Sequence, residues 1–430
     1  MAATEGEDMD VGNIAELNTF LVLDAIRSSR QATRAELSRE LGLSDASVSR
    51  IVKRLLARGI IEERPGEATV RGRTPAVLHF VGPVGGVIAV DLGGTKCHGA
   101  LADLAGETVT EDISSIGSGG DAAETLLQCI ATLRRKSRAI DMPVRAVVVG
   151  IPALIDPKSG LATAGPNVHW EGFDLMRVLA SNLKEPFEVD NDVNLAALGQ
   201  AWRGQGRGVE SFVTVSLGTG IGGAVVVGGR LVRGRHNAAG EVGYFLMSPS
   251  QLRSSAGQPG FEQVASGPAL KARAAAILAE GHPSVLDPRR LEVADVFAAA
   301  ASGDATGQQV VRELLDHLAV MVVGITALVD PERIILDGSI ARAFEPWLGE
   351  LRELVESKVF SPPDIVMSKL GPNATVIGAM ARALAIVSQS DAPAPISKRV
   401  VVVPDHPRSP ASETALGEAD GAVEVTVERA

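Results

Sequence analysis

The 430-residue sequence predicts an α/β protein in which a short helical unit precedes a two-lobed α/β body. Helical spacing of apolar residues over 33–61 gives way near Gly82 to glycine-rich apolar runs that alternate with helical segments. A strand, a glycine loop and a second strand are then indicated twice, at 87–103 and at 212–232. This repeat suggests two related lobes with a cleft between them.

Changes in composition and in apolar spacing divide the chain into four segments. Residues 1–12 form an acidic arm that we expect to be disordered, and residues 13–81 form the helical unit. The α/β body occupies residues 84–388. Residues 389–430 are polar and contain several prolines, so we expect a disordered tail there.

Charge and cysteine usage narrow the class of protein. The net charge of −11 argues against a polycation that coats nucleic acid, yet residues 27–73 carry 11 Lys/Arg against six Asp/Glu. Cys97 and Cys129 are too few for a disulfide framework or a cysteine-rich zinc site. Because the sequence shows no apolar signal core and no run of about 18 apolar residues, we expect a cytoplasmic protein without a membrane partner.

The segment 33–61 predicts two short helices joined at a glycine. Thr33 and Glu36 fit the capping box of the first helix, and Gly42 permits the tight turn that follows. Ser44 can cap the second helix. The apolar positions of the second helix recur at helical spacing: Val48, Ile51, Val52, Leu55 and Leu56. This order is typical of a helix-turn-helix unit, whose second helix enters the major groove of DNA.

The second helix and the hairpin after it supply the candidate DNA contacts. Small residues on the helix allow close approach, cations can reach bases or phosphates, and the following two predicted strands form a wing with arginines near its tip. The candidates are Ser47, Ser49, Arg50, Lys53, Arg54, Arg71 and Arg73. The alternative interpretation is a solvated basic helix pair that docks on the body.

Two glycine loops of the body follow apolar strands and can hold phosphate groups. In DLGGTK at 91–96, Asp91 can hold a magnesium-bound water, Gly93 and Gly94 expose backbone N–H groups, and Lys96 can neutralise phosphate charge. The spacing is not that of a Walker loop. GTGIGG at 218–223 offers a second cradle. Each loop alone is equally compatible with an ordinary hairpin turn.

Polar side chains beside further turns can bind a sugar. VDNDVN at 189–194 places Asp192, which can accept a hydroxyl proton, next to Asn191 and Asn194. Asn167 in GPNVHW and Glu241 in GEVGY also stand beside glycine turns, where they can bind sugar hydroxyls. An isolated Asn-Asp pair is also typical of a simple turn.

Taken in order, DLGGTK, GPN, ND, GTGIGG, GEVGY and PGFEQVASGPAL resemble the ROK family of repressors and sugar kinases. The resemblance implies the two-lobed actin-like, ribonuclease H-like sugar-kinase fold, and the head resembles the winged helix-turn-helix of the family's regulators. It implies Asp192 as catalytic base if kinase activity is retained. The implied sugar contacts are Asn167, Asn191, Asp192, Glu241 and Glu262. The implied phosphate contacts are Asp91, Gly93, Gly94, Thr95, Lys96, Gly218, Thr219 and Gly220.

The sequence departs from the family pattern at two places. Tyr244 stands where many members have a zinc-binding histidine, and 254–263 lacks the cysteine cluster that completes the zinc site, so we expect no zinc and assign no residue as a metal ligand. Asp337 replaces a glycine of the triplet expected near the adenosine. We expect this carboxylate to crowd or repel a nucleotide.

The sequence therefore predicts a DNA-binding transcriptional regulator, a repressor of genes for sugar uptake or catabolism. Its expected partners are a double-stranded DNA operator, a sugar or sugar-phosphate effector, and a second copy of the chain in a homodimer or higher homo-oligomer. Regulation would need no cofactor. The alternative is a hexose or N-acetylhexosamine kinase that uses ATP and Mg²⁺ and carries a DNA-binding head. A third hypothesis is a protein–protein scaffold whose ligand sites are vestigial.

Overall fold

The computed structural model of the chain describes residues 18–19, 21–23, 25–26, 32–57, 59–66, 76–81, 85–116, 121–156, 162–163, 175–253 and 260–389. Four expectations fall outside these residues: the arm at 1–12, the tail from residue 390 onward, the wing arginines Arg71 and Arg73, and Asn167. The last helix reaches Gln389, the residue at which we placed the start of the tail.

The head contains the two predicted helices and a β-hairpin, and among the residues described before them 18–19, 21–23 and 25–26 are also helical. Its elements are α2 (Arg34–Leu41), α3 (Asp45–Ala57), β1 (Ile61–Pro65) and β2 (Ala76–Phe80), the two strands being antiparallel. The Thr33 hydroxyl accepts from the Glu36 N–H and the Glu36 carboxylate accepts from the Thr33 N–H, which confirms the capping box. Gly42 has φ 64°, and the Ser44 hydroxyl accepts from the Ser47 N–H at the start of α3. The predicted caps and turn are therefore confirmed.

The first lobe of the body is built on a five-stranded sheet in the order β5-β4-β3-β6-β9. The first three strands in sequence are antiparallel: β3 (Gly86–Leu92), β4 (Lys96–Asp103) and β5 (Thr108–Ser115). The next two run parallel to β3: β6 (Val144–Ile151) and β9 (Phe187–Asn191). Alternate residues of β3 face two cores, one shared with α4 (Ala122–Ala139) and α5 (Leu175–Asn182), the other with α13 (Ala374–Gln389). A two-stranded ribbon, β7 (Leu154–Ile155) and β8 (Ala162–Thr163), follows β6.

The second lobe repeats this plan in the order β12-β11-β10-β13-β14. Three antiparallel strands come first: β10 (Phe212–Leu217), β11 (Ile221–Val227) and β12 (Arg230–Val232). Two strands parallel to β10 follow: β13 (Arg333–Asp337) and β14 (Asp364–Met367). One face of the sheet packs on α6 (Asp192–Arg203). The other face packs on the apolar sides of the remaining helices: α7 (Glu262–Ala265), α8 (Gly267–Ala279), α9 (Val293–Ala301), α10 (Ala305–Val329), α11 (Gly338–Phe344) and α12 (Leu348–Glu356).

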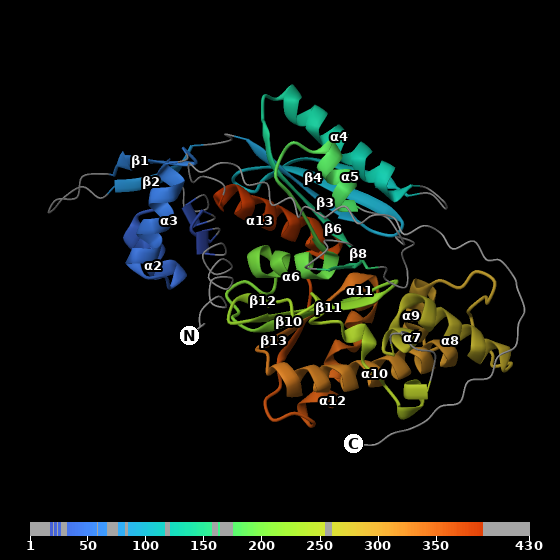
Figure 1. The fold of residues 1–430 in the computed structure, drawn as a ribbon. Helices are drawn as coiled ribbons and strands as arrows, with labels where there is room; N and C mark the ends of the chain where they lie inside the picture. Colours follow the sequence, from blue (N-terminus) through green and yellow to red (C-terminus); the bar gives the residue numbers. More distant parts are fainter. Residues whose placement is uncertain are drawn as a thin grey trace, which may run out of the picture.

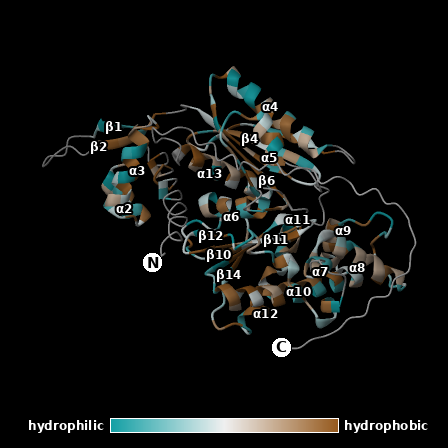
Figure 2. Cartoon of the chain, in the orientation of Figure 1, coloured by the Kyte–Doolittle hydropathy of each residue, from teal (hydrophilic) through white to brown (hydrophobic). Residues whose placement is uncertain are grey.

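The shared strand order confirms that the two glycine-loop hairpins mark related lobes. Figure 1 shows α6 and α13 lying between the two sheets, and Figure 2 shows hydrophobic strands inside both lobes. The two helices approach closely at glycines. A Cβ on Gly378 would lie 1.6 Å from the Leu195 carbonyl oxygen, and one on Gly199 would lie 2.5 Å from that of Ala374. Within the described residues, no helix is long and apolar enough to cross a bilayer.

Candidate functional site

The outward face of α3 carries the predicted DNA contacts that the structure describes. Its inner residues, including Val48 and Leu55, are buried in a core that the head forms from its own residues. Ser49, Arg50 and Lys53 are exposed, while Ser47 and Arg54 are partly buried. Because the apolar side of α3 is already satisfied within the head, its cations are directed to solvent and remain available for phosphates or bases.

Four acidic residues of the body come together from both lobes. Asp91 lies near the end of β3, Asp192 begins α6, Glu241 precedes a short 3₁₀ turn (Val242–Tyr244), and Glu262 begins α7. Gly240, with φ 91°, allows the backbone before Glu241 to pass over β11, where a Cβ would lie 2.5 Å from the Gly223 oxygen. These residues are far apart in sequence but share one region between the sheets.

Mutual repulsion and burial shape the electrostatics of this acidic cluster. Burial, together with the charges of Asp91 and Glu241, raises the pKa of Asp192 to about 7, although the hydrogen bond from the Val193 N–H acts to lower it. Burial also raises the pKa of Asp91 to about 6, although Lys96 and His98 act to lower it. The pKa of Glu241 is raised by burial and by Glu262. The cluster therefore holds carboxyl groups that titrate near neutral pH, as acid–base catalysis and proton-linked ligand binding require.

Tyr244 lies beside the acidic cluster at the position where we noted the loss of a histidine. It is half exposed, and burial together with the charges of Glu241 and Glu262 raises the pKa of its phenol. Among the described residues, no three His, Cys, Asp or Glu side chains are arranged to hold a metal ion. The expectation of no zinc stays a prediction.

The two glycine loops close their turns with backbone N–H groups, so the Gly93 N–H is not exposed for a phosphate, contrary to our expectation. The β3–β4 turn closes through a hydrogen bond from the Gly93 N–H to the Lys96 carbonyl, and a Cβ on Gly94 would meet nothing within 4 Å. Thr95, Lys96 and Thr219 are exposed. In the second loop the Gly218 N–H donates to the Gly220 carbonyl. The open space beside Gly94 and the exposed Thr95, Lys96 and Thr219 leave room for phosphate groups, and the nucleotide and magnesium contacts stay predictions.

Two predicted sugar contacts also hold the site together. The Asn191 side-chain oxygen accepts from the backbone N–H groups of Val193 and Asn194 at 3.0 and 3.1 Å, so it caps α6. A Glu262 oxygen accepts from the Ile221 N–H at 2.7 Å and thereby joins α7 to the start of β11. Any sugar contact by these residues has to use their remaining polar atoms.

Asp337 is directed into the second lobe. The residue is 7% exposed, and its carboxylate caps α11 by accepting from the Gly338 N–H. Burial raises its pKa, against the lowering effect of hydrogen bonds that include Ser368 and Gln200. This inward position argues against the crowding that we expected, while the effect of Asp337 on nucleotide binding stays a prediction.

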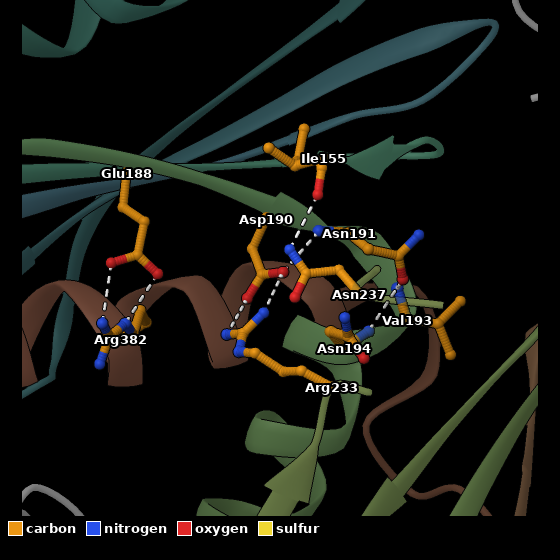
Figure 3. Close-up of polar contacts among 9 residues, drawn as sticks. All are labelled: Ile155, Glu188, Asp190, Asn191, Val193, Asn194, Arg233, Asn237 and Arg382. Atoms are coloured by element: carbon orange, nitrogen blue, oxygen red, sulfur yellow. Dashed lines mark hydrogen bonds and ion pairs between the residues drawn. The ribbon is translucent and has the colours of Figure 1, made fainter. Parts of the chain in front are cut away.

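Sequence analysis missed a set of polar links beside Asp192 (Figure 3). Arg233 makes two hydrogen bonds to Asp190, of 2.9 and 2.6 Å, and Arg382 makes two to Glu188, of 2.9 and 2.8 Å. Asn237 donates to the Ile155 carbonyl at 2.8 Å. No local pattern in the sequence indicated these links, because each joins residues that are far apart in the chain.

Comparison with known proteins agrees with both parts of the structure. A family model described as the ROK family matches residues 87–386, and one described as the MarR family matches residues 16–71. The xylose repressor of Caldicellulosiruptor bescii is 27% identical over 381 residues, which cover 86% of this chain and 95% of the repressor. The glucokinase of Halalkalibacterium halodurans is 30% identical over 305 residues, which cover 68% of this chain and 92% of the glucokinase.

A solved structure extends this similarity to the whole arrangement. It is a ROK family transcriptional regulator described as a homologue of the E. coli MLC protein. The TM-score is 0.72 at 25% identity, over 87% of this chain and 97% of that structure. The match therefore includes head and body together.

Proposed function

The chain belongs to the ROK family, and from this premise we propose that it is a sugar-responsive transcriptional repressor. In this proposal the head binds operator DNA, and a sugar or sugar phosphate binds at the acidic cluster of the body. Occupancy of the cluster changes the relative position of the two lobes and so changes operator affinity. The regulated genes would be those for uptake or catabolism of the same sugar.

One observation carries the proposal: a winged helix-turn-helix with outward cations precedes, in the same chain, the sugar-kinase-like body. The similarity to the xylose repressor spans 95% of that protein, so it includes the repressor's head as well as its body. A glucokinase aligns over a smaller part of this chain, 68%. The head is the part that distinguishes a regulator from a kinase, and this chain has it.

The DNA-binding part is tested by fluorescence anisotropy with the DNA upstream of the chain's own operon. Lys53→Ala should raise Kd about tenfold and reduce the slope of log Kd against log salt by about 1, because one phosphate contact is lost. Arg135→Ala, which removes an exposed cation from α4 of the body, is the matched control and should leave both quantities unchanged. Equal behaviour of the two variants, or no specific binding by the native chain, would reject an α3 interface.

The effector part is tested by thermal shift of the full chain with D-xylose, D-glucose and N-acetyl-D-glucosamine. A sugar that binds only the folded state raises the unfolding temperature in proportion to the logarithm of its concentration. The same sugar should change operator affinity, and Glu241→Gln should abolish both effects. If a sugar stabilises the chain equally with and without the Glu241 carboxylate, the acidic cluster is not its site.

We propose that the operator is bound by a homodimer, because helix-turn-helix proteins generally recognise two half-sites about one helical turn apart. Sedimentation of the DNA complex measures the number of chains bound. A single chain on the operator at saturation would exclude this form of recognition.

A second candidate function is an ATP-dependent sugar kinase that carries a DNA-binding head. The raised pKa of Asp192, about 7, is suited to a base that accepts a hydroxyl proton near neutral pH, and this observation favours the candidate. In it, the two glycine loops would hold the nucleotide phosphates and Asp91 a magnesium-bound water. Turnover in an ADP-release assay that is lost in Asp192→Asn would support it, and no turnover with any sugar that binds would exclude it.

A further inference from the structure

A segment of the second lobe reaches over to the first lobe beside Asp192. We call residues 233–241 the strap. It begins directly after β12 and ends at Glu241, one of the four acidic residues of the cluster. Gly234 and Asn237 both have positive φ, 70° and 56°, so the backbone reverses sharply within it.

The strap is fixed to the first lobe at two points (Figure 3). The Arg233 guanidinium donates two hydrogen bonds to the Asp190 carboxylate at the end of β9, and the Asn237 amide donates to the Ile155 carbonyl of β7 at 2.8 Å. A hydrogen bond from the Ala239 N–H to the Arg233 carbonyl closes the strap on itself. Two contacts therefore hold the start and the middle of the strap on the first lobe, and an internal hydrogen bond holds its backbone conformation.

Asp190 is also joined to Asn191, the predicted sugar contact next to Asp192. Its side chain is 6% exposed, and one of its oxygens also accepts from the Asn191 N–H at 2.8 Å. Asn191 caps the helix that Asp192 begins. Burying a carboxylate is costly without a paired cation, so Arg233 stabilises the buried Asp190 and, through it, the backbone at Asn191.

We infer that the Arg233–Asp190 ion pair positions the strap so that Glu241 faces Asp192, and that it couples sugar occupancy to the relative position of the lobes. The ion pair does not touch the sugar; it acts through Glu241 on one side and through Asn191 on the other. This inference rests on the proposed function, because it assigns a role in the same sugar site. Loss of the pair should release the strap while leaving each lobe folded.

The chain contains a matched control two residues away on the same strand. Glu188 and Arg382 form an equivalent two-bond pair between β9 and α13, with side chains 29% and 21% exposed. Both members lie on the first lobe and make their two mutual hydrogen bonds there, whereas their effect on Arg233 is through charge alone. Arg233→Met and Arg382→Met therefore make the same chemical change with and without release of the strap.

Hydrogen exchange of the full chain, followed by mass spectrometry, measures release of the strap without any ligand. In Arg233→Met, peptides covering 233–241 should exchange about tenfold faster or more, because local opening is no longer opposed by the ion pair. In Arg382→Met, faster exchange should be confined to α13 and β9. Unchanged exchange of the strap in Arg233→Met would overturn the inference.

Sugar affinity provides the readout that a purely structural pair would not move. With whichever of D-xylose, D-glucose and N-acetyl-D-glucosamine stabilises the native chain, Arg233→Met should raise the sugar Kd about tenfold or more, whereas Arg382→Met should change it less than about twofold. Arg233→Lys keeps the positive charge but cannot make both guanidinium hydrogen bonds to Asp190, so its sugar affinity should lie between those of the native chain and Arg233→Met. Equal sugar affinity in Arg233→Met and Arg382→Met would overturn the inference.

A double variant separates positioning from stability. Asp190→Asn combined with Arg233→Met removes the uncompensated buried carboxylate, so it should recover thermal stability relative to Arg233→Met but keep the fast strap exchange and the weak sugar affinity. Recovery of slow exchange in the double variant would overturn the inference. If the native chain binds none of the three sugars, the proposed effector fails, and the exchange measurement still decides the role of Arg233.

Discussion

At the scale of the residue, burial and the neighbouring carboxylates of the acidic cluster disfavour the ionised form of Asp192. Asp192 begins a helix, where a negative charge is favoured, and accepts from the Val193 N–H at 2.9 Å. Burial and the neighbouring carboxylates nevertheless raise its pKa to about 7. The net result is a carboxyl group that binds a proton more tightly in the folded chain than in the unfolded chain.

This raised pKa predicts the sign of a pH effect on stability. Since the folded state holds the proton up to about pH 7 and the unfolded state releases it near the ordinary value of 3.8, ionisation of Asp192 should cost stability increasingly as pH rises between these values. Asp192→Asn removes that cost, so it should stabilise the chain by roughly 1–3 kcal/mol at pH 8.

Thermal unfolding of both proteins from pH 5 to pH 8 measures this difference, which should shrink toward pH 5. A variant that is destabilised at pH 8, or a difference independent of pH, would contradict the raised pKa. Asp316→Asn, at an exposed aspartate of α10, is the control for the loss of a carboxylate as such.

At the scale of the element, the head depends on a turn whose geometry only the backbone determines. Gly42 ends α2 with φ 64°, and a Cβ there would meet no atom within 4 Å. A side chain would therefore find space at this position. Glycine is favoured here because the backbone is in the left-handed conformation. The turn fixes the angle at which α3 leaves α2, and therefore the direction of its cations.

Gly42→Ala should destabilise the head by about 1 kcal/mol, because alanine adopts this conformation at a cost. The matched control is Gly349→Ala in α12, where a Cβ also meets nothing within 4 Å but the conformation is an ordinary helical one. That variant should be neutral or more stable by about 0.5–1 kcal/mol. Calorimetry measures both changes, and equal effects would show that conformation at Gly42 is unimportant.

The sequence predicted those parts of the fold that depend on neighbouring residues. The capping box at Thr33, the glycine turn at Gly42 and both glycine-loop hairpins are local, and each is confirmed. The Arg233–Asp190 pair joins residues 43 positions apart, so no local pattern could indicate it. The same applies to the proximity of Asp91 and Asp192, which only the family resemblance implied.

At the scale of the whole molecule, α6 and α13 form the contact through which the lobes can move relative to each other. α6 packs on the second sheet through Val193 and Ala197, whereas α13 packs on the first sheet through Val376 and Ala383. Their crossing needs Gly199 and Gly378, and the Thr375 hydroxyl donates to the Asp192 carbonyl at 3.3 Å. A change at the crossing therefore reaches the acidic cluster directly.

Gly378→Ala should destabilise the body by about 3 kcal/mol or more, since its Cβ would overlap the Leu195 carbonyl oxygen and force the helices apart. Gly324→Ala in α10 is the matched control, because its Cβ would meet only Phe245 at an ordinary 3.7 Å. Thermal unfolding of the two variants should differ clearly. Similar unfolding temperatures would mean that the crossing relaxes without cost.

The repeated strand order allows the two lobes to be compared position by position. Aligned by their loops, DLGGT of the first half corresponds to SLGTG of the second, so Asp91 corresponds to Ser216. On the adjacent parallel strand, Gly150 pairs with Asp91, and Asp337 pairs with Ser216. Each lobe thus has one acid at this pair of positions. In the first lobe it is Asp91 on β3, and in the second lobe it is Asp337 on β13, the strand that corresponds to β6. Gly150 could not take the acid, because its Cβ would lie 2.7 Å from Thr375. The two sheets share one strand order, and the crowding at Gly150 keeps their acids on different strands.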